Sequence, residues 1–248
     1  MESVSESFRA RHELAEDAEA TRVLVSLEIT RERMAEHFPR TLVGLTVVLH
    51  GSFASLALAR PPVALAWFAS APAGRRYVAG WADKRELHVL GERALGTRAS
   101  ALPESGEMLR LAAAVLYARR VVAENNHDLR RKLAPFRGAA DLRWAWLLEG
   151  AARWFSGQTD YARPAIARRL REGRRPRFPP GVRDAALLGG TVIDLLVSLE
   201  GELAAAQAAC RLHPQGPRAA LSKAFCERPM TEIEGTWRAH LARLAAAG

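Results

Sequence analysis

Apolar residues in the second half of the chain recur at the three- and four-residue spacing of amphipathic helices. From Ser105 onward no run alternates with the period of two that is typical of half-buried strands. The pattern predicts helices over six segments: 107–124, 140–156, 160–172, 183–209, 216–225 and 230–246. Clusters of Gly, Pro and Arg predict breaks at 135–138, 157–159, 173–181 and 213–217.

The N-terminal part carries a mixed pattern. Residues 5–38 contain helix formers with apolar side chains spaced for one face of a long helix or of two helices, and Pro39 ends this run. A β-branched run predicts a strand over 43–49, and small residues predict a short helix over 52–59. Residues 75–91 are predicted to form two strands around a turn at 82–84. We therefore predict an α+β, predominantly helical fold in which a small N-terminal sheet precedes a helical body.

One domain is expected over 1–248. The 248 residues, 49% of them hydrophobic, are enough to bury a core, and no internal repeat or low-complexity segment divides them. We expect four consecutive parts: an N-terminal helical segment at 1–40, a sheet-containing part at 41–104, the helices of the candidate site at 105–173, and C-terminal helices at 174–248.

The chain is basic and arginine-rich, with a net charge of +9 and only three lysines among its 36 Lys+Arg residues. Glu172 lies within its densest basic run and few aromatic residues accompany that run, which favours a solvated surface over a nucleic-acid site. Nucleic acid is thus a possible partner but not the favoured one. The run comprises Arg163, Arg168, Arg169, Arg171, Arg174, Arg175 and Arg177.

Cysteine content and hydropathy exclude further classes. Cys210 and Cys226 are too few for a disulfide framework or a four-sulfur zinc site, so we expect free thiols. The N-terminus mixes acidic and basic residues without an apolar core, which predicts a cytoplasmic protein. Residues 41–59 lack formal charge over the length of a membrane span, but His50, Gly51 and Ser52 interrupt them, so no membrane insertion is expected.

Three segments together resemble zinc metallopeptidases of the gluzincin type. The sequence WLLEGAARWFSG at 146–157 resembles the family's W-L-x-E-G-x-A-x-x-x-x-G helix, and LYARRVVAENN at 116–126 stands where the family has H-E-x-x-H-x-x-x-x-x-N. Residues 220–241 resemble the closing helix of these domains, and 187–201 resemble the helix that covers the active-site pair. The resemblance implies a zincin-like fold with Glu149 at the position of the third zinc ligand.

The chain departs from the family at the first helix. Leu116 and Arg120 stand at the two histidine positions, and Tyr117 stands at the catalytic glutamate. Leucine has no lone pair to offer a metal, and arginine stays protonated at neutral pH. Because Glu149 alone cannot hold zinc, we predict no metal and no cofactor at these former active-site positions.

Glu149 then needs another counter-charge. A guanidinium can replace the metal, and Arg120, Arg119 and Arg153 are the alternatives, the last lying four residues along the same helix. Tyr117 either adds its hydroxyl to the same site or packs in the core. Other candidate cleft residues are Asn125, Asn126 and Trp146.

The resemblance therefore implies a catalytically degenerate metallopeptidase-like protein. We expect it to bind a peptide, a protein or a small ligand in the former cleft without hydrolysing it. Two alternatives stay open: an enzyme with metal-independent chemistry that uses Glu149 with Tyr117 or Arg120, and a basic adaptor for an acidic partner or nucleic acid.

Overall fold

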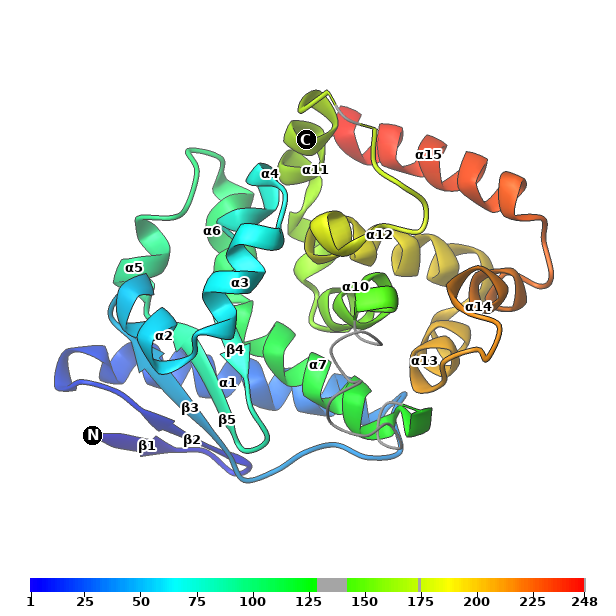
Figure 1. Cartoon of the computed structure of the whole chain (residues 1–248). Helices are drawn as coiled ribbons and strands as arrows, with labels where there is room; N and C mark the ends of the chain where they lie inside the picture. The colour runs from blue at the N-terminus through cyan, green and yellow to red at the C-terminus, as the bar shows by residue number, and fades with distance from the viewer. Residues whose placement is uncertain (129–141, 174, 248) are drawn as a thin grey trace.

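A five-stranded sheet occupies the N-terminal part of the computed structural model, which describes residues 1–128, 142–173 and 175–247 (Figure 1). Its order is β1-β2-β3-β5-β4, with β2, β3 and β5 parallel and the two edge strands antiparallel to their neighbours. Helices make up most of the remainder, so the predicted α+β, predominantly helical fold is confirmed. The strands are β1 (Glu2–Val4), β2 (Phe8–Arg11), β3 (Leu45–His50), β4 (Gly80–Ala82) and β5 (Glu86–Leu90).

The two faces of the sheet differ in polarity. Along β3, Leu45, Val47 and Leu49 are buried on the face that α1 (Asp17–Ala35) and α7 (Ala112–Asn125) cover. Thr46, Val48 and His50 point to the other face, where α2 (Phe53–Ala59) and α3 (Pro62–Ala69) lie in front of the sheet (Figure 1). Alternation along a strand sends successive side chains to opposite faces, so one face forms core and the other carries polar groups.

The N-terminal segment departs from its prediction. Residues 1–16 are not part of a long helix: β1 and β2 precede α1, which begins at Asp17. In β2, Phe8 and Ala10 are buried while the arginines between and after them are exposed. Four residues are too short a run for that alternation to stand out among helix formers, and the parallel pairing with β3 decides the conformation. Two of the apolar residues whose spacing predicted a helical face over 5–38, Leu14 and Ile29, are exposed.

The predicted strands at 43–49 and 75–91 and the helix at 52–59 agree with β3, the β4–β5 hairpin and α2. The hydroxyl of Ser52 accepts the Ser55 N–H at 3.1 Å and caps α2, which explains the change from strand to helix at this point. Three short helices near prolines or glycines were not predicted, namely α3, α4 (Pro72–Arg75) and α5 (Glu92–Gly96).

The helical body follows most of the predicted segments, but the segment 107–124 spans the end of α6 and most of α7, which meet at Leu111. The segment 183–209 is two helices instead of one, because Gly201 adopts φ +88° between them. The predicted break at 135–138 and the first residues of the segment 140–156 lie outside the described residues. The elements are α6 (Pro103–Arg110), α7, α10 (Ala145–Phe155), η2 (Gln158–Tyr161), α11 (Arg163–Arg171), α12 (Val182–Glu200), α13 (Glu202–Cys210), α14 (Pro217–Ala224) and α15 (Met230–Ala246).

Helices α10 and α12 cross in direct backbone contact. A Cβ on Gly150 would collide with the carbonyl oxygen of Gly189, and a Cβ on Gly189 would lie 2.6 Å from the carbonyl oxygen of Trp146. Only glycine permits this approach. Because Glu149 precedes Gly150, the contact fixes where the Glu149 side chain lies.

Within the described ranges, no helix combines the length and the apolar character that a membrane span requires. Residues 41–59 contain β3 and α2 instead of one continuous helix. Cys210 and Cys226 are free thiols, as predicted.

Candidate functional site

Two arginines clamp the carboxylate of Glu149. Arg119 of α7 places Nε 3.0 Å from Oε1, and Arg153, one turn along α10, places Nη1 3.5 Å from Oε2. The sequence left three arginines as alternatives, and the structure brings two of them to Glu149 together. A guanidinium on each oxygen supplies the positive charge that the carboxylate needs.

Arg153 is the more deeply buried partner, with 8% of its side chain exposed against 22% for Glu149. Its Nε donates to the carbonyl of Ala186 on α12, so the side chain bridges the two crossing helices. Burial lowers the pKa of Arg153, and the Glu149 charge opposes this shift. The ion pair is therefore part of the α10–α12 contact.

Arg119 links the same carboxylate to the sheet. Its guanidinium carbon lies 5.8 Å from the ring centroid of Trp81 on β4, within the range of a cation–π contact. Arg120 turns elsewhere: its Nη2 donates to the carbonyl of Lys84 at 3.4 Å. Neighbouring helical residues point about 100° apart, and of the three alternatives Arg119 and Arg153 pair with Glu149 whereas Arg120 does not.

Tyr117 lies on the opposite side of α7 and is fully buried. Its hydroxyl donates to the Leu42 carbonyl at 3.1 Å and accepts the Leu42 N–H at 3.3 Å, and its ring meets Phe8 edge-on at 5.2 Å. Burial raises the pKa of Tyr117 to about 12, against the opposing effect of the Leu42 hydrogen bond. Tyr117 is a core residue, and the hypothesis that it shares an acid–base site with Glu149 is wrong.

The remaining candidates are also structural. Leu116 contacts the backbone of the hairpin, because a Cβ on Gly80 would lie 2.7 Å from its Cδ1. Asn125 donates to the carbonyls of Arg40 at 2.7 Å and Val121 at 2.8 Å, and Asn126 donates to that of Ala209 at 2.8 Å. These bonds tie the end of α7 to the chain before β3 and to α13. Trp146 is buried on α10 and lines a different pocket.

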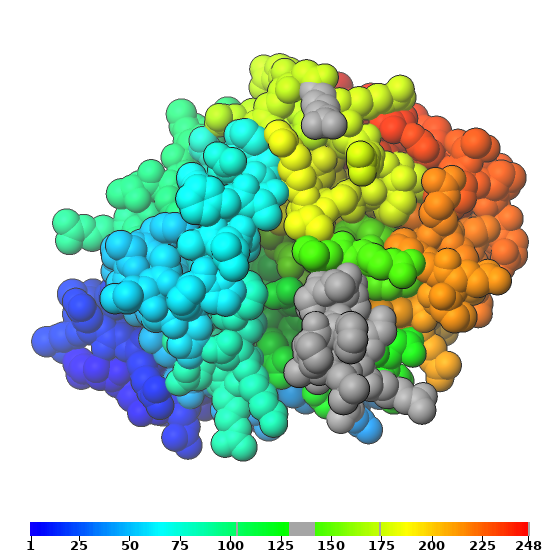
Figure 2. All heavy atoms as spheres, in the orientation of Figure 1, coloured from blue at the N-terminus to red at the C-terminus, as the bar shows by residue number. Residues whose placement is uncertain are grey.

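A hollow opens on the face drawn in Figure 2. It lies between the α3–β4 region, in cyan, and helices α10 and α12, in green and yellow. Trp81 on β4 is half-buried, and the Arg119 guanidinium of α7 lies over its ring. An aromatic ring beside a guanidinium is a common anchor in protein interfaces.

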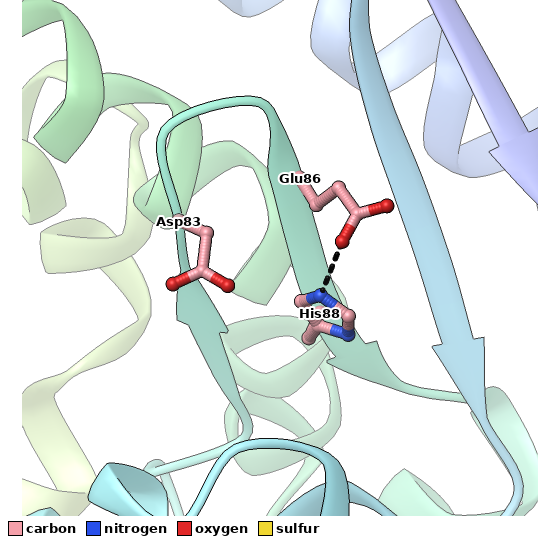
Figure 3. Close-up of side chains that lie close together, drawn as sticks. All are labelled: Asp83, Glu86 and His88. Atoms are coloured by element: carbon pink, nitrogen blue, oxygen red, sulfur yellow. Dashed lines mark hydrogen bonds and ion pairs between the residues drawn. The ribbon is translucent and has the colours of Figure 1, made fainter.

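A second cluster, absent from the sequence predictions, lies on the β4–β5 hairpin. Asp83, Glu86 and His88 point toward one another, and their possible ligand atoms all lie within 4.8 Å (Figure 3). His88 Nε2 is 3.2 Å from Glu86 Oε2. The signal was present in the sequence: residues 86 and 88 are two apart on a predicted strand, so they share a face, and residue 83 lies in the adjoining turn.

The guanidinium of Arg60 lies beside the two carboxylates, where a metal ion bound by this cluster would supply the positive charge. Arg60, at the end of α2, pairs through Nη2 with Glu86 Oε2 at 3.0 Å and through Nε with Asp83. Arg11 adds a contact to the other oxygen of Glu86 at 3.2 Å. Two carboxylates and an imidazole are suitable metal ligands, but the guanidinium already satisfies both acids and repels a second cation.

His50 joins the cluster through His88: its Nε2 lies 3.0 Å from Nδ1 of His88. Burial lowers the pKa of both imidazoles. For His50 the neighbouring His88 and Arg60 add to this effect, whereas for His88 the Arg60 charge adds and Glu86 opposes. Both side chains are therefore neutral at neutral pH.

The basic run at 163–177 does not form one surface. Arg169 is buried and makes a two-point ion pair with Asp184, at 2.6 Å and 3.0 Å. Arg174 lies outside the described residues. The exposed members are Arg163, Arg168, Arg171, Arg175 and Arg177.

The site around Glu149 therefore holds a fixed carboxylate, two guanidinium groups and the Trp81 ring, whereas the hairpin cluster holds an arginine among metal-type ligands. Comparison of the chain with protein-family models, with curated proteins and with solved structures gives no match.

Proposed function

We propose that this chain is a zincin-like protein without hydrolytic activity that binds a peptide in the hollow beside Glu149. One observation carries the proposal: both oxygens of Glu149 are paired with arginines, at the position where the resembled family has a zinc ligand.

The residues around Glu149 do not suit zinc. Zinc sites use imidazole, thiolate or carboxylate groups, whereas Glu149 is met by two cations. The contacts also favour reading the family motif two residues later along α7, because Arg119 faces Glu149 and Tyr117 does not. In that register Ala118, Arg119 and Val122 stand at the motif positions, and none of them can bind a metal.

A peptide is the ligand class that this geometry favours. The strand β4 is an edge of the sheet, and an extended segment can add to an edge strand through main-chain hydrogen bonds. Trp81 on β4 and Arg119 supply the residue types that dominate peptide and protein recognition. The alternative of a metal-independent enzyme loses support, since the hydroxyl of Tyr117 is bonded on the far side of α7.

The loss of hydrolytic chemistry is tested by elemental analysis of the purified protein, beside a casein cleavage assay. We expect well under one zinc per chain and no cleavage. About one zinc per chain that is lost in Glu149→Ala would overturn the proposal, because it would make Glu149 a ligand.

Peptide binding is tested by selecting phage-displayed random dodecapeptides on the immobilised protein. Enriched peptides should bind the wild type and lose about tenfold or more of their affinity for Trp81→Ala, a loss typical of an aromatic anchor. The control is Leu203→Ala, which removes an exposed apolar side chain from α13, a helix that does not border the hollow. Failure to enrich any sequence, or equal loss in both variants, would contradict a peptide site at Trp81.

A further inference from the structure

A pocket of about 1090 Å³ lies within the helical body. It is bounded by α10, the end of α12, α13, α14 and the loop between the last two helices. Neither Glu149 nor its partners Arg119 and Arg153 line it, so it is distinct from the hollow beside Glu149. Its volume lies slightly above the usual range of small-molecule sites, about 300–1000 Å³.

The inner wall of the pocket is formed by buried apolar side chains. Five of its large side chains are at most 3% exposed: Trp144 at the start of α10, Trp146 and Leu147 on α10, Leu196 on α12, and Leu221 on α14. Small residues of α13, including Ala204 and Ala208, leave the space open. Such a wall suits an aliphatic chain.

The wall also holds an unsatisfied donor. The indole N–H of Trp146 is buried, and no acceptor meets it in the described part of the chain. A buried donor without an acceptor costs free energy, and an oxygen that reaches it removes that cost.

The rim of the pocket carries a surplus of positive charge. Arg143, Arg211 and Lys223 are exposed there, and within the described ranges no carboxylate forms an ion pair with them.

The lining also holds two acids. Glu200 pairs with Arg228 at 3.0 Å, whereas Asp128 accepts the Leu212 N–H at 2.7 Å and keeps its negative charge. Three cations therefore stand against one carboxylate that forms no ion pair within the described ranges, so the apolar interior lies beneath a surplus of positive charge.

We propose that this pocket binds an amphipathic anion, an aliphatic chain that ends in a carboxylate. The chain would lie against the tryptophans and leucines, and the carboxylate would meet Arg211 and Lys223 at the rim. Guanidinium and ammonium groups recognise carboxylates by charge-assisted hydrogen bonds. This site is independent of peptide binding beside Glu149.

Decanoate is the probe, measured by isothermal titration calorimetry below its micelle concentration, with decyltrimethylammonium as a cationic ligand of equal chain length. We expect decanoate to bind one site per chain in the micromolar range, and the ammonium to bind at least about tenfold more weakly, because it meets the same cations. Absence of decanoate binding, or equal binding of the two head groups, would overturn the proposal.

Variants locate the site. Arg211→Gln combined with Lys223→Gln changes exposed side chains only, and should weaken decanoate binding about tenfold while the Arg218→Gln control, an exposed α14 residue outside the lining, leaves it unchanged. Ala208→Trp should fill the pocket and abolish binding. If circular dichroism shows that this variant does not fold, the charge variant decides the outcome. Trp81→Ala should bind decanoate like the wild type, so failure of one site is distinguishable from failure of the other.

Discussion

Two clusters in this molecule pair carboxylates with arginines, and they are built differently. At Glu149 the partners project from packed helices, and the Arg153 side chain is 8% exposed. On the hairpin the partners come from a turn, a strand and a helix end, and the Arg60 side chain is 28% exposed. The first cluster has no imidazole among its pairs, whereas the second includes His88 and, through it, His50.

The difference in burial predicts that the Glu149 cluster contributes to stability with a fixed charge, whereas the charge of the hairpin cluster changes with pH. Removal of one partner from a buried pair leaves a charge that water cannot reach, so the Glu149 cluster should tolerate little change. The carboxylates and arginines of the hairpin cluster are partly solvated, and the pKa of its two imidazoles lies below the ordinary value of 6.5, so its charge should change as the pH falls, at a smaller cost in stability. Four experiments test this contrast.

The largest effect is expected at the contact that positions Glu149. Gly150→Ala places a Cβ against the backbone of Gly189, so the helices must separate, and we expect a loss of about 4 kcal/mol or failure to fold. Chemical denaturation measures the change. Gly106→Ala on α6 is the control, because a Cβ there meets nothing within 4 Å, and it should be neutral or stabilising by up to about 1 kcal/mol. Equal behaviour of the two variants would show that α10 and α12 do not cross in backbone contact.

Next in size is removal of the Glu149 carboxylate. Glu149→Ala leaves Arg153 buried without its counter-charge, and we expect a loss of about 3 kcal/mol in the free energy of unfolding. Glu86→Ala on the hairpin should cost only about 1 kcal/mol, because its partners are partly exposed. Urea denaturation of both variants gives the comparison, and a larger loss at Glu86 would reverse the contrast between the clusters.

A smaller effect should appear with pH. The folded-state pKa of His50 and of His88 is lowered, so the unfolded chain binds more protons below the ordinary value of 6.5, and stability falls as the pH falls through that region. His50 is half-buried and His88 is buried, and Glu86 opposes the lowering of the His88 pKa, so we expect a loss of about 1 kcal/mol between about pH 7.5 and pH 5.5.

The double variant His50→Gln with His88→Gln should remove this pH dependence, whereas His127→Gln, which changes an exposed histidine, should retain it. Urea denaturation at several pH values is the measurement. A slope that persists in the double variant would assign the dependence to other groups.

The smallest effect on stability is expected at Arg60. Arg60→Gln removes two partly exposed ion pairs and should cost about 0.5–1 kcal/mol. Its clearer readout is the pKa of the two imidazoles, which should rise in NMR titrations because the Arg60 charge lowers both. Unchanged titration curves would show that Arg60 does not govern the charge of this cluster.

Much of the fold followed from local patterns. The helices of the second half, the β4–β5 hairpin and the strand at 43–49 show clear spacing or β-branched runs, and these agree with the structure. The strand β2 could not be predicted in this way, because the four residues FRAR are too few to show an alternation of apolar and polar side chains. Their conformation comes from pairing with β3.

The candidate site was predicted in part. The motif around Glu149 located one carboxylate, and charge balance implied an arginine partner. The choice among Arg119, Arg120 and Arg153 depends on the rotation of α7 against α10, and a sequence does not contain that angle. The same rotation sends Tyr117 into the core.

The sequence by itself determined the helices of the second half, the strand at 43–49 and the β4–β5 hairpin, that Glu149 lies on an amphipathic helix, and that the first helix lacks metal ligands, because propensity, periodicity and side-chain chemistry are local properties. The tertiary structure alone decided that two arginines share Glu149, that Arg60 lies among Asp83, Glu86 and His88, and that a pocket opens between α10 and α14. These features depend on how distant elements approach one another, and that approach is set by contacts such as the one between Gly150 and Gly189.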